Sequence, residues 1–476
     1  MKKTKFILIL NLFVDLINCL QINSNKGYLY PTEKWFDQRL DHFDLTEDRL
    51  FKQRYFVSDQ YWDKLEGPLF FYAGNEGDVT SFVNNTGFIW DIAPLFKAKV
   101  IFAEHRYYGV TLPFGKQKPS VKTKKEFSKL NSEQALADYA LLLTSEIEAA
   151  RQFQNKKLKI VSFGGSYGGM LSAWLRIKFP HIVDASVASS APINYFYEQV
   201  DCSLFNKVVT DGFKQTPVKG EKCVKNIQRS WDVIKQFDSI DNGMEKLSYI
   251  FKTCEELETS NQLIDWITET FSELAMVNYP YPAQFLADLP AWPLNRTCDE
   301  VSQNGLNDFQ LLVSMQNALG IFHNFSGNAE CFNIGSTDNS KIDGNLWEYQ
   351  TCTEMVMPFC SNGQTDMFPP ASWNLLNFTS QCKKKYGTTP RSRWQVINYG
   401  GSYLKYATKI LFMNGLLDPW HVGSPMKSVS MGTRVVNMWG AAHHLDLRHV
   451  RDDLPQSVKD AHNIEIALIQ KWLAEV

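Results

Sequence analysis

The chain has 476 residues, of which 44% are hydrophobic and 13% aromatic, and its formal net charge is −2 at pH 7. So much apolar surface allows a large buried core, divided by length into two or three domains, and excludes an intrinsically disordered chain. The balanced charge gives no electrostatic reason for binding nucleic acid, so we expect no nucleic-acid partner.

The N-terminus has the pattern of a secretory signal peptide. Lys2, Lys3 and Lys5 precede a mostly apolar stretch, residues 6–14, which is too short to span a bilayer. We expect a signal peptide over residues 1–20 and no membrane span elsewhere, which directs the protein to the secretory pathway and to a lysosomal or extracellular location. N-glycosylation sequons fit this route and begin at Asn84, Asn295, Asn324 and Asn377.

Apolar runs predict the strands of one open α/β sheet. They cover residues 68–72, 98–103, 158–163, 409–413 and 434–438. Residues 133–149 have helical spacing, which predicts a helix that packs on the sheet before the third run.

The third run leads into residues 164–168, which read Gly-Gly-Ser-Tyr-Gly and fit the G-x-S-x-G pattern. Glycines two positions before and after a serine let the backbone take a strained turn and let strand and helix pack closely. Residues 170–175 can continue as a helix. We therefore expect a nucleophile elbow that carries Ser166 and an α/β-hydrolase fold.

The groups that follow have the order of a catalytic triad. Asp418 lies on a loop after the fourth run, and His443 lies after the fifth. Serine, then acid, then histidine is the chain order of α/β-hydrolases. Asp418 precedes a proline, so a plain turn is the alternative for this residue alone.

The adjacent histidines His443 and His444 also suggest a metal site. Neighbours in an extended segment point to opposite sides, so the pair would not easily converge on one ion. The sequence has no cysteine near them and no H-E-x-x-H pattern. We therefore expect no metal and no cofactor.

An oxyanion hole needs two backbone donors. In this fold the first is the N–H of the residue after the nucleophile, here Tyr167, and the second comes from the loop after an earlier strand. That loop follows residues 68–72 and offers Gly74 or Asn75, for which a plain tight turn is the alternative.

A long insertion separates the nucleophile from the acid. About 250 residues lie between Ser166 and Asp418, whereas a strand-helix-strand unit needs only about 30. The insertion contains helical patterns, such as 227–237 and 262–276, and all the cysteines except Cys19. An even number of cysteines in a secreted chain suggests disulfides. We therefore expect an α/β-hydrolase domain, 28–191 and 393–476, and a mainly helical, disulfide-rich cap, 192–392.

Several motifs, taken together and in order, resemble the prolyl carboxypeptidase/dipeptidyl peptidase II family of serine exopeptidases. They are residues 74–78, 104–109, 164–169, 418–420 and 443–448, and the likeness extends from about Trp35 to the C-terminus. Two runs within the cap, 275–281 and 357–363, are more similar to the carboxypeptidase branch than to the dipeptidyl peptidase branch.

The resemblance implies an enzyme that cleaves short peptides after a proline near a chain end. It assigns Ser166 as the nucleophile, Asp418 as the orienting acid and His443 as the base. It places an apolar proline pocket on Met170, Met367 and Trp420, for which ordinary core packing is the alternative. It also implies a supporting pair, His444 and Arg448, with an exposed Arg448 as the alternative.

The resemblance also implies how the cysteines of the cap pair. The pairs are Cys202–Cys360, Cys223–Cys298, Cys254–Cys331 and Cys352–Cys382. The oligomeric state stays open, with a homodimer as one alternative.

Which end of the peptide is cut is not decided by the sequence. A dipeptidyl peptidase needs a carboxylate for the free amino terminus, and Glu76, Asp78 and Asp366 are candidates. A carboxypeptidase needs a cation or donors for the terminal carboxylate, and Arg448 is a candidate. The two runs in the cap favour the carboxypeptidase.

Two other classes of protein are less favoured. An esterase or lipase usually has an oxyanion loop of the His-Gly-Gly-Gly type, which is not found here. A non-catalytic hydrolase fold used for binding usually lacks a triad residue, and all three are present.

Overall fold

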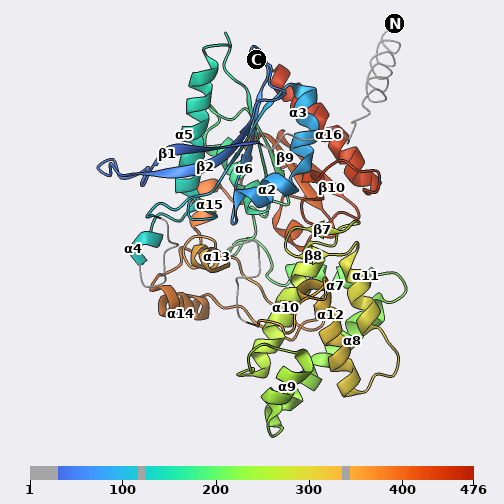
Figure 1. Ribbon diagram of the computed structural model, residues 1–476. Helices are drawn as coiled ribbons and strands as arrows, with labels where there is room; N and C mark the ends of the chain where they lie inside the picture. Colours follow the sequence, from blue (N-terminus) through green and yellow to red (C-terminus); the bar gives the residue numbers. More distant parts are fainter. Residues whose placement is uncertain (1–30, 116–123, 335–343, 476) are drawn as a thin grey trace.

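The computed structural model describes residues 31–115, 124–334 and 344–475 (Figure 1). The expected signal peptide at 1–20 lies outside the described residues. Among the described helices, none is both long and apolar enough to cross a membrane. The sequon residues Asn84 and Asn377 are exposed, and Asn295 and Asn324 are partly exposed.

The centre of the molecule is an eight-stranded sheet with the order β1-β2-β4-β3-β5-β6-β9-β10. The strands are β1 Thr32–Arg39, β2 Leu50–Ser58, β3 Leu69–Ala73, β4 Lys99–Ala103, β5 Ile160–Gly165, β6 Ala185–Ser189, β9 Thr408–Gly415 and β10 Gly432–Met438. β2 is antiparallel to β1 and β4, and the remaining neighbours are parallel. This topology confirms the expected α/β-hydrolase fold.

Burial explains which strands the sequence reveals. β3 and β5 are buried along their whole length, so they read as continuous apolar runs. β1 lies at the edge of the sheet and is exposed at most positions. Because β1 contains several charged side chains, it does not form an apolar run and is not predicted as a strand. β6 is buried as well, but it consists of alanines, serines and one valine.

Helices cover both faces of the sheet (Figure 1). One face carries α5, α6 and α15, and the other carries α3 and α16. The helices of this domain are α2 Val79–Asn85, α3 Gly87–Phe96, α4 Lys124–Phe127, α5 Ser132–Ala150, α6 Tyr167–Lys178, α15 Trp394–Tyr399 and α16 Gln456–Ala474. α5 is the helix expected at 133–149, and the side chain of Asn131 caps its first turn.

The insertion between β6 and β9 has two parts. The first is a bundle with two short strands, separate from α13 and α14 in Figure 1. Its elements are α7 Leu204–Lys214, α8 Gly220–Gln236, η1 Phe237–Ser239, α9 Gly243–Phe251, α10 Ser260–Met276, β7 Ala283–Gln284, β8 Asp288–Leu289, α11 Pro293–Val301 and α12 Asp308–His323. α8 and α10 are the helices expected at 227–237 and 262–276.

The second part contains α13 Gly344–Thr351 and α14 Leu375–Tyr386. It packs against a hydrophobic cluster of the hydrolase domain that includes Tyr107, Tyr108 and Phe127. This separate cluster divides the segment that the sequence presents as one cap.

Disulfides join these parts in the four pairs that the resemblance implies. Two of them close the helical bundle: Cys223–Cys298 joins α8 to α11, and Cys254–Cys331 joins the segments after α9 and α12. Cys202–Cys360 joins the start of the insertion to the segment after α13, and Cys352–Cys382 joins the residue directly after α13 to α14. The cap is therefore cross-linked within each part and from one part to the other.

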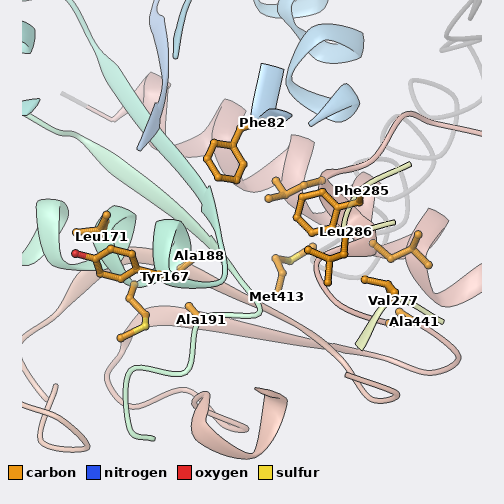
Figure 2. Packing of buried hydrophobic residues seen from close by; sticks show 14 of the residues in the cluster. Phe82, Tyr167, Leu171, Ala188, Ala191, Val277, Phe285, Leu286, Met413 and Ala441 are labelled. Carbon is orange, nitrogen blue, oxygen red and sulfur yellow. The ribbon is translucent and has the colours of Figure 1, made fainter. Parts of the chain in front are cut away.

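The bundle and the sheet share one hydrophobic core. Figure 2 shows Phe285 and Leu286 of the insertion beside Met413 of β9, and all three belong to the same buried cluster. Val277, directly after α10, and Ala441, after β10, belong to this cluster as well. Burial of this apolar surface holds the bundle over the carboxyl ends of the strands.

Candidate active site

Ser166 lies on a sharp turn between β5 and α6. Its backbone has φ 58° and ψ −129°, which is unusual for a residue other than glycine. The Ser166 N–H donates to Ser189 O over 3.0 Å, which fixes the turn against β6. Such a strained conformation persists only where its surroundings impose it, and it is common at functional sites.

The glycines of the pentapeptide are required by close contacts. A Cβ on Gly164 would lie 2.0 Å from the carbonyl oxygen of Gly168. A Cβ on Gly168 would lie 2.8 Å from both Ala73 O and Asn75 Oδ1. The elbow thus needs glycine on both sides of the serine, as the sequence pattern predicts.

Asp418 and His443 form a buried, hydrogen-bonded pair. Asp418 follows β9 and caps the short helix η3 Pro419–Gly423, where it accepts the Trp420 N–H over 3.0 Å. Its other oxygen lies 2.8 Å from His443 Nδ1. A carboxylate at Nδ1 selects the tautomer with the proton on that atom, so Nε2 is left as a base.

A cavity brings Ser166 and this pair together. Ser166 and His443 line the same cavity of about 520 Å³, which lies between the sheet, α10 and α13. Among the described residues, no hydrogen bond joins their side chains. Hydrogen bonds between a nucleophile and its base are often long without substrate and shorten when it binds.

The oxyanion donors are narrowed to two backbone groups. The Tyr167 N–H lies at the first turn of α6, where helix N–H groups have no partner within the helix. Gly74 was expected as an alternative donor, but its N–H donates to Ala103 O over 3.1 Å and is therefore not available. Asn75 lines the cavity, and its N–H donates to no other group in the described part of the chain.

The sequence of the chain, compared with known proteins, agrees with this geometry. Residues 38–465 match the family model of serine carboxypeptidase S28. The chain belongs to the serine carboxypeptidase S28 family. It is 42% identical over 443 residues to human lysosomal Pro-X carboxypeptidase, covering 93% of this chain and 88% of the relative.

Other relatives of the chain are more distant. Prolyl carboxy peptidase like protein 5 of Caenorhabditis elegans is 34% identical over 473 residues, 93% of this chain and 90% of that protein. Human thymus-specific serine protease is 28% identical over 465 residues, 93% of this chain and 87% of that protein. The S28 relationship therefore covers both the hydrolase domain and the insertion.

The three carboxylates that were candidates for binding a free amino terminus differ in their position in this S28 peptidase. Glu76 lines the cavity, and burial raises the pKa of its carboxyl group, although Asn75 and His443 lower it partly. Asp78 caps α2 and pairs with Arg54 over 2.7 Å. Asp366 is buried and accepts three backbone N–H groups of its own loop. Asp78 and Asp366 are therefore held in structural roles.

Arg448 is buried rather than exposed, and it does not line the cavity. Its guanidinium lies 4.7 Å from the ring centres of both Tyr279 and Phe285. It donates to Asn85 Oδ1 over 2.6 Å and to the Tyr279 hydroxyl over 3.0 Å. The Tyr279 hydroxyl in turn donates to His443 O over 3.0 Å. Arg448 thus contacts the catalytic loop through Tyr279, and its candidacy for a substrate carboxylate is not supported.

His444 is packed against the elbow. Its ring lies 5.2 Å from the ring of Phe285, and a Cβ on Gly165 would lie 2.9 Å from it. Burial, together with His443 and Arg448, lowers the pKa of His444 well below its usual value. This shift favours the neutral form of the ring, so His444 opposes a second positive charge beside His443.

The apolar part of the cavity corrects one expected pocket residue. Met170 and Trp420 line the cavity as expected, together with Phe205 and Phe359. Met367 was expected there, but it is completely buried behind the wall, where Trp231 donates to its carbonyl oxygen over 2.7 Å. From the loop that contains Met367, the methionine that lines the cavity is Met357, ten positions earlier. The two methionines lie in one loop, so the sequence alone does not show which of them faces inward.

Sequence reasoning missed the part of the site that α10 contributes. The His443 N–H donates to Met276 O over 3.0 Å at the end of this helix, and Trp420 Nε1 contacts Met276 Sδ over 3.1 Å. The acidic residues Asp265, Glu269 and Glu273 of the same helix also line the cavity. Their spacing of four residues marks one helix face, but nothing in the sequence shows that this face turns toward Ser166.

Proposed function

We propose that the protein is a prolyl carboxypeptidase, which removes the last residue of a peptide when the residue before it is proline. The observation that carries the proposal is the wall of Met170, Met357 and Trp420 in the cavity that also contains Ser166. A proline ring is compact, apolar and without an N–H donor, and it packs well on an indole face and on flexible thioether side chains.

The aromatic wall is itself held firmly. The ring of Trp420 makes edge contacts with the rings of Phe205, Phe359 and Tyr195, at centre distances of 5.0, 5.7 and 5.8 Å. Its indole N–H contacts Met276 Sδ. A wall held from several sides favours one ring size and one orientation over others.

The geometry supports a two-step acyl transfer. His443 Nε2 takes the proton of Ser166 Oγ while this oxygen attacks the prolyl carbonyl carbon. The negative charge that develops on the carbonyl oxygen is stabilised by the N–H groups of Tyr167 and Asn75. His443 then gives its proton to the leaving amine, the peptide bond breaks, and the prolyl acyl group stays on Ser166 as an ester.

Water completes the cycle. His443 accepts a proton from the water as it attacks the ester and returns it to Ser166 Oγ, so the peptide leaves with proline as its new C-terminus. Asp418 keeps Nδ1 protonated throughout and stabilises the imidazolium that forms in each step. No group other than the enzyme, the peptide and water is needed to balance these steps.

Removal of an N-terminal X-Pro dipeptide is the second candidate. It is favoured by Glu76, a carboxyl group that lines the cavity close to Asn75. The burial of Glu76 weakens this candidate, because its carboxyl group already accepts a hydrogen bond from the Asn75 side chain over 2.8 Å and is poorly accessible to a free amino terminus. Moreover, several relatives of about 42% identity are named Pro-X carboxypeptidases.

Those relatives are named lysosomal, and we propose the same acidic location for this protein. Two buried carboxyl groups support the proposal. Burial raises the pKa of Asp446 and of Glu354 to about 7. Both groups are therefore neutral and cheaper to bury in an acidic compartment.

The triad is tested by a serine substitution with a matched control. We expect Ser166→Ala to lower kcat for a peptide ending in Pro-Phe by a factor of at least about 10⁴ and to abolish fluorophosphonate labelling. Ser402 lies on the surface outside the cavity, and Ser402→Ala should behave like the unchanged protein. Labelling that persists in Ser166→Ala would contradict the assignment of the nucleophile.

A further inference from the structure

One face of α10 is acidic and lines the cavity. Asp265, Glu269 and Glu273 are each four residues apart, so they lie one above another on the same side of the helix. All three line the cavity that contains Ser166 and His443. The helix ends at Met276, whose carbonyl oxygen accepts the N–H of His443. The acidic face therefore starts beside the catalytic histidine and leads away from it.

In the described part of the chain, these carboxyl groups have no protein cation bound to them. Within residues 31–115, 124–334 and 344–475, no ion pair of 4.0 Å or less involves Asp265, Glu269 or Glu273. Lys235 is near enough to Asp265 to lower its pKa partly, yet it hydrogen-bonds Asn261 and Ser260 instead.

This arrangement carries an electrostatic cost, because the carboxyl groups are partly buried and close to one another. Burial raises the pKa of Asp265, of Glu269 and most of all of Glu273, to about 8. Asp265 raises the pKa of Glu269, and Glu269 raises that of Glu273, because like charges repel. Asp265 and Glu269 are exposed to solvent and therefore accessible to a ligand. A cation bound beside the three carboxyl groups would lower their pKa values and favour their charged forms.

We infer that Asp265, Glu269 and Glu273 form a subsite for a positively charged side chain, arginine or lysine, on the N-terminal side of the substrate proline. The subsite adds selectivity to the proposed function and rests on it. The substrate peptide itself carries this ligand. When its proline lies beside Ser166, the rest of the peptide must extend through the same cavity.

The length of the acidic face decides which part of the peptide it contacts. The helical rise from Asp265 to Glu273, eight positions later, is about 12 Å at about 1.5 Å per residue. An extended peptide advances about 3.3 Å per residue, so this face matches about three to four peptide residues. A carboxypeptidase substrate has a single residue after the cleaved bond. The remainder of the face must therefore contact residues before the proline.

The apolar and acidic parts of the cavity then have separate tasks. Trp420, Met170 and Met357 hold the proline ring, which every substrate shares. The face of α10 selects among substrates by the charge of residues farther from the bond. An attraction of this kind acts through solvent that is only partly excluded, so it should weaken as the ionic strength increases.

Peptides with an acetylated N-terminus test the inference. One set is Ac-Ala-Ala-Ala-Ala-Pro-Phe with a single alanine replaced in turn by arginine or by glutamate, and release of phenylalanine is measured as kcat/KM at low and high salt. We expect arginine to be preferred over glutamate by about tenfold at the best position, since one partly exposed charge pair contributes a factor of up to about five and repulsion of the glutamate acts in the same direction. The preference should shrink in high salt.

Variants of the full chain connect that preference to α10. The triple variant Asp265→Asn/Glu269→Gln/Glu273→Gln should bring the ratio of kcat/KM for the arginine and glutamate peptides close to one. Glu269→Lys alone should shift the ratio toward the glutamate peptide. Glu221 is an exposed acid on α8 that does not line the cavity, and Glu221→Gln should keep the ratio of the unchanged protein.

The outcomes separate this inference from the function on which it rests. If the all-alanine peptide is not cleaved at its C-terminus, the proposed function is wrong. If it is cleaved but arginine and glutamate peptides react equally, or if the triple variant and Glu269→Lys keep the original ratio, the subsite is wrong. Thermal unfolding of each variant shows whether a changed ratio comes from a folded protein.

Discussion

The two walls of the cavity hold their polar groups in opposite ways. On the hydrolase wall, the Asp418 carboxylate accepts hydrogen bonds from Trp420 and His443, and the Ser166 backbone is bound to β6. On the cap wall, the carboxyl groups of Glu269 and Glu273 have no bound partner among the described residues. Both walls contain several functional groups, but among these groups only those of the hydrolase wall have hydrogen-bond partners within the described part of the protein.

This difference corresponds to two tasks: the hydrolase wall carries out the reaction, and the cap wall selects the substrate. Groups that act on the common carbonyl must be in place before the substrate arrives, so they are oriented by hydrogen bonds inside the protein. Groups that recognise a variable side chain must remain unpaired, because a satisfied charge would gain little from binding another. The cap wall thus carries an electrostatic cost that the substrate removes.

Asp418→Asn should have the largest effect, and it tests the role of the hydrogen bonds on the hydrolase wall. The amide cannot hold the Nδ1 proton as the carboxylate does, so we expect kcat to fall by about 10⁴ with little change in folding. Steady-state kinetics and a thermal unfolding curve provide the measurement. Asp232 is an exposed acid on α8, and Asp232→Asn should leave kcat unchanged. A loss of less than tenfold in Asp418→Asn would mean that the histidine is oriented by other groups.

Met357→Ala and Met367→Ala form a pair that separates the cavity wall from the core behind it. Met357→Ala should lower kcat/KM for a Pro-Phe peptide by about 10- to 200-fold, because pocket contacts of this size contribute about 1–3 kcal/mol. Met367→Ala should instead lower the free energy of unfolding by about 2–5 kcal/mol, since it leaves a cavity in the core.

Kinetics and denaturant unfolding of both methionine variants measure the two effects. If Met367→Ala loses kcat/KM and Met357→Ala does not, the assignment of the wall is reversed.

Asp446→Asn tests how a buried carboxyl group on the hydrolase side makes the free energy of unfolding depend on pH. Asp446 is fully buried in the segment that directly follows His443 and His444, and it accepts a hydrogen bond from Ser189. Folding raises its pKa from 3.8 to about 7. Between about pH 4 and pH 7 the folded protein keeps a proton that the unfolded chain has released. The free energy of unfolding must therefore decrease as the pH rises, by about 1.4 kcal/mol per pH unit for this group.

The asparagine variant should lose that part of the slope and become more stable relative to the unchanged protein at pH 7. An asparagine oxygen can still accept the hydrogen bond of Ser189, so the comparison isolates the titration. Denaturant unfolding at several values between pH 4 and pH 7 measures it, and an unchanged slope would show that Asp446 does not hold the proton.

Tyr279→Phe should have the smallest effect and tests the contact between the two walls. The hydroxyl connects Arg448 to the backbone oxygen of His443. Losing it removes two hydrogen bonds of about 1 kcal/mol each, and we expect kcat to fall by a few-fold while KM changes little. Tyr281→Phe is the matched control, because Tyr281 stacks on Tyr279 and contacts Arg451 instead. Equal effects of both variants on kcat would contradict a role for the hydroxyl of Tyr279.

The hydrolase wall could be predicted from the sequence because its signals are local. The elbow at Ser166 can be recognised by glycines that no larger residue can replace. The loops that carry Asp418 and His443 can be recognised because they follow buried strands. The choice between Gly74 and Asn75 was beyond the sequence, since it depends on a hydrogen bond to Ala103 on a neighbouring strand.

The cap wall could not be predicted in the same way. Its helices are visible as patterns, yet the side of α10 that faces Ser166 is decided by packing between segments more than one hundred residues apart. The same reason explains the error at Met367. A loop with a methionine at each end does not show which one is turned inward until the fold places Trp231 behind it.

The central claim is that Ser166 attacks the carbonyl of a proline next to the C-terminus, and product analysis tests it most directly. The purified protein is incubated with Ac-Ala-Ala-Pro-Phe, with the same peptide ending in an amide, and with a peptide that begins Lys-Pro, and the products are separated by mass. We expect free phenylalanine from the first peptide, much less reaction with the amide, and no Lys-Pro dipeptide from the third. Release of Lys-Pro with the acetylated peptide left intact would contradict the claim.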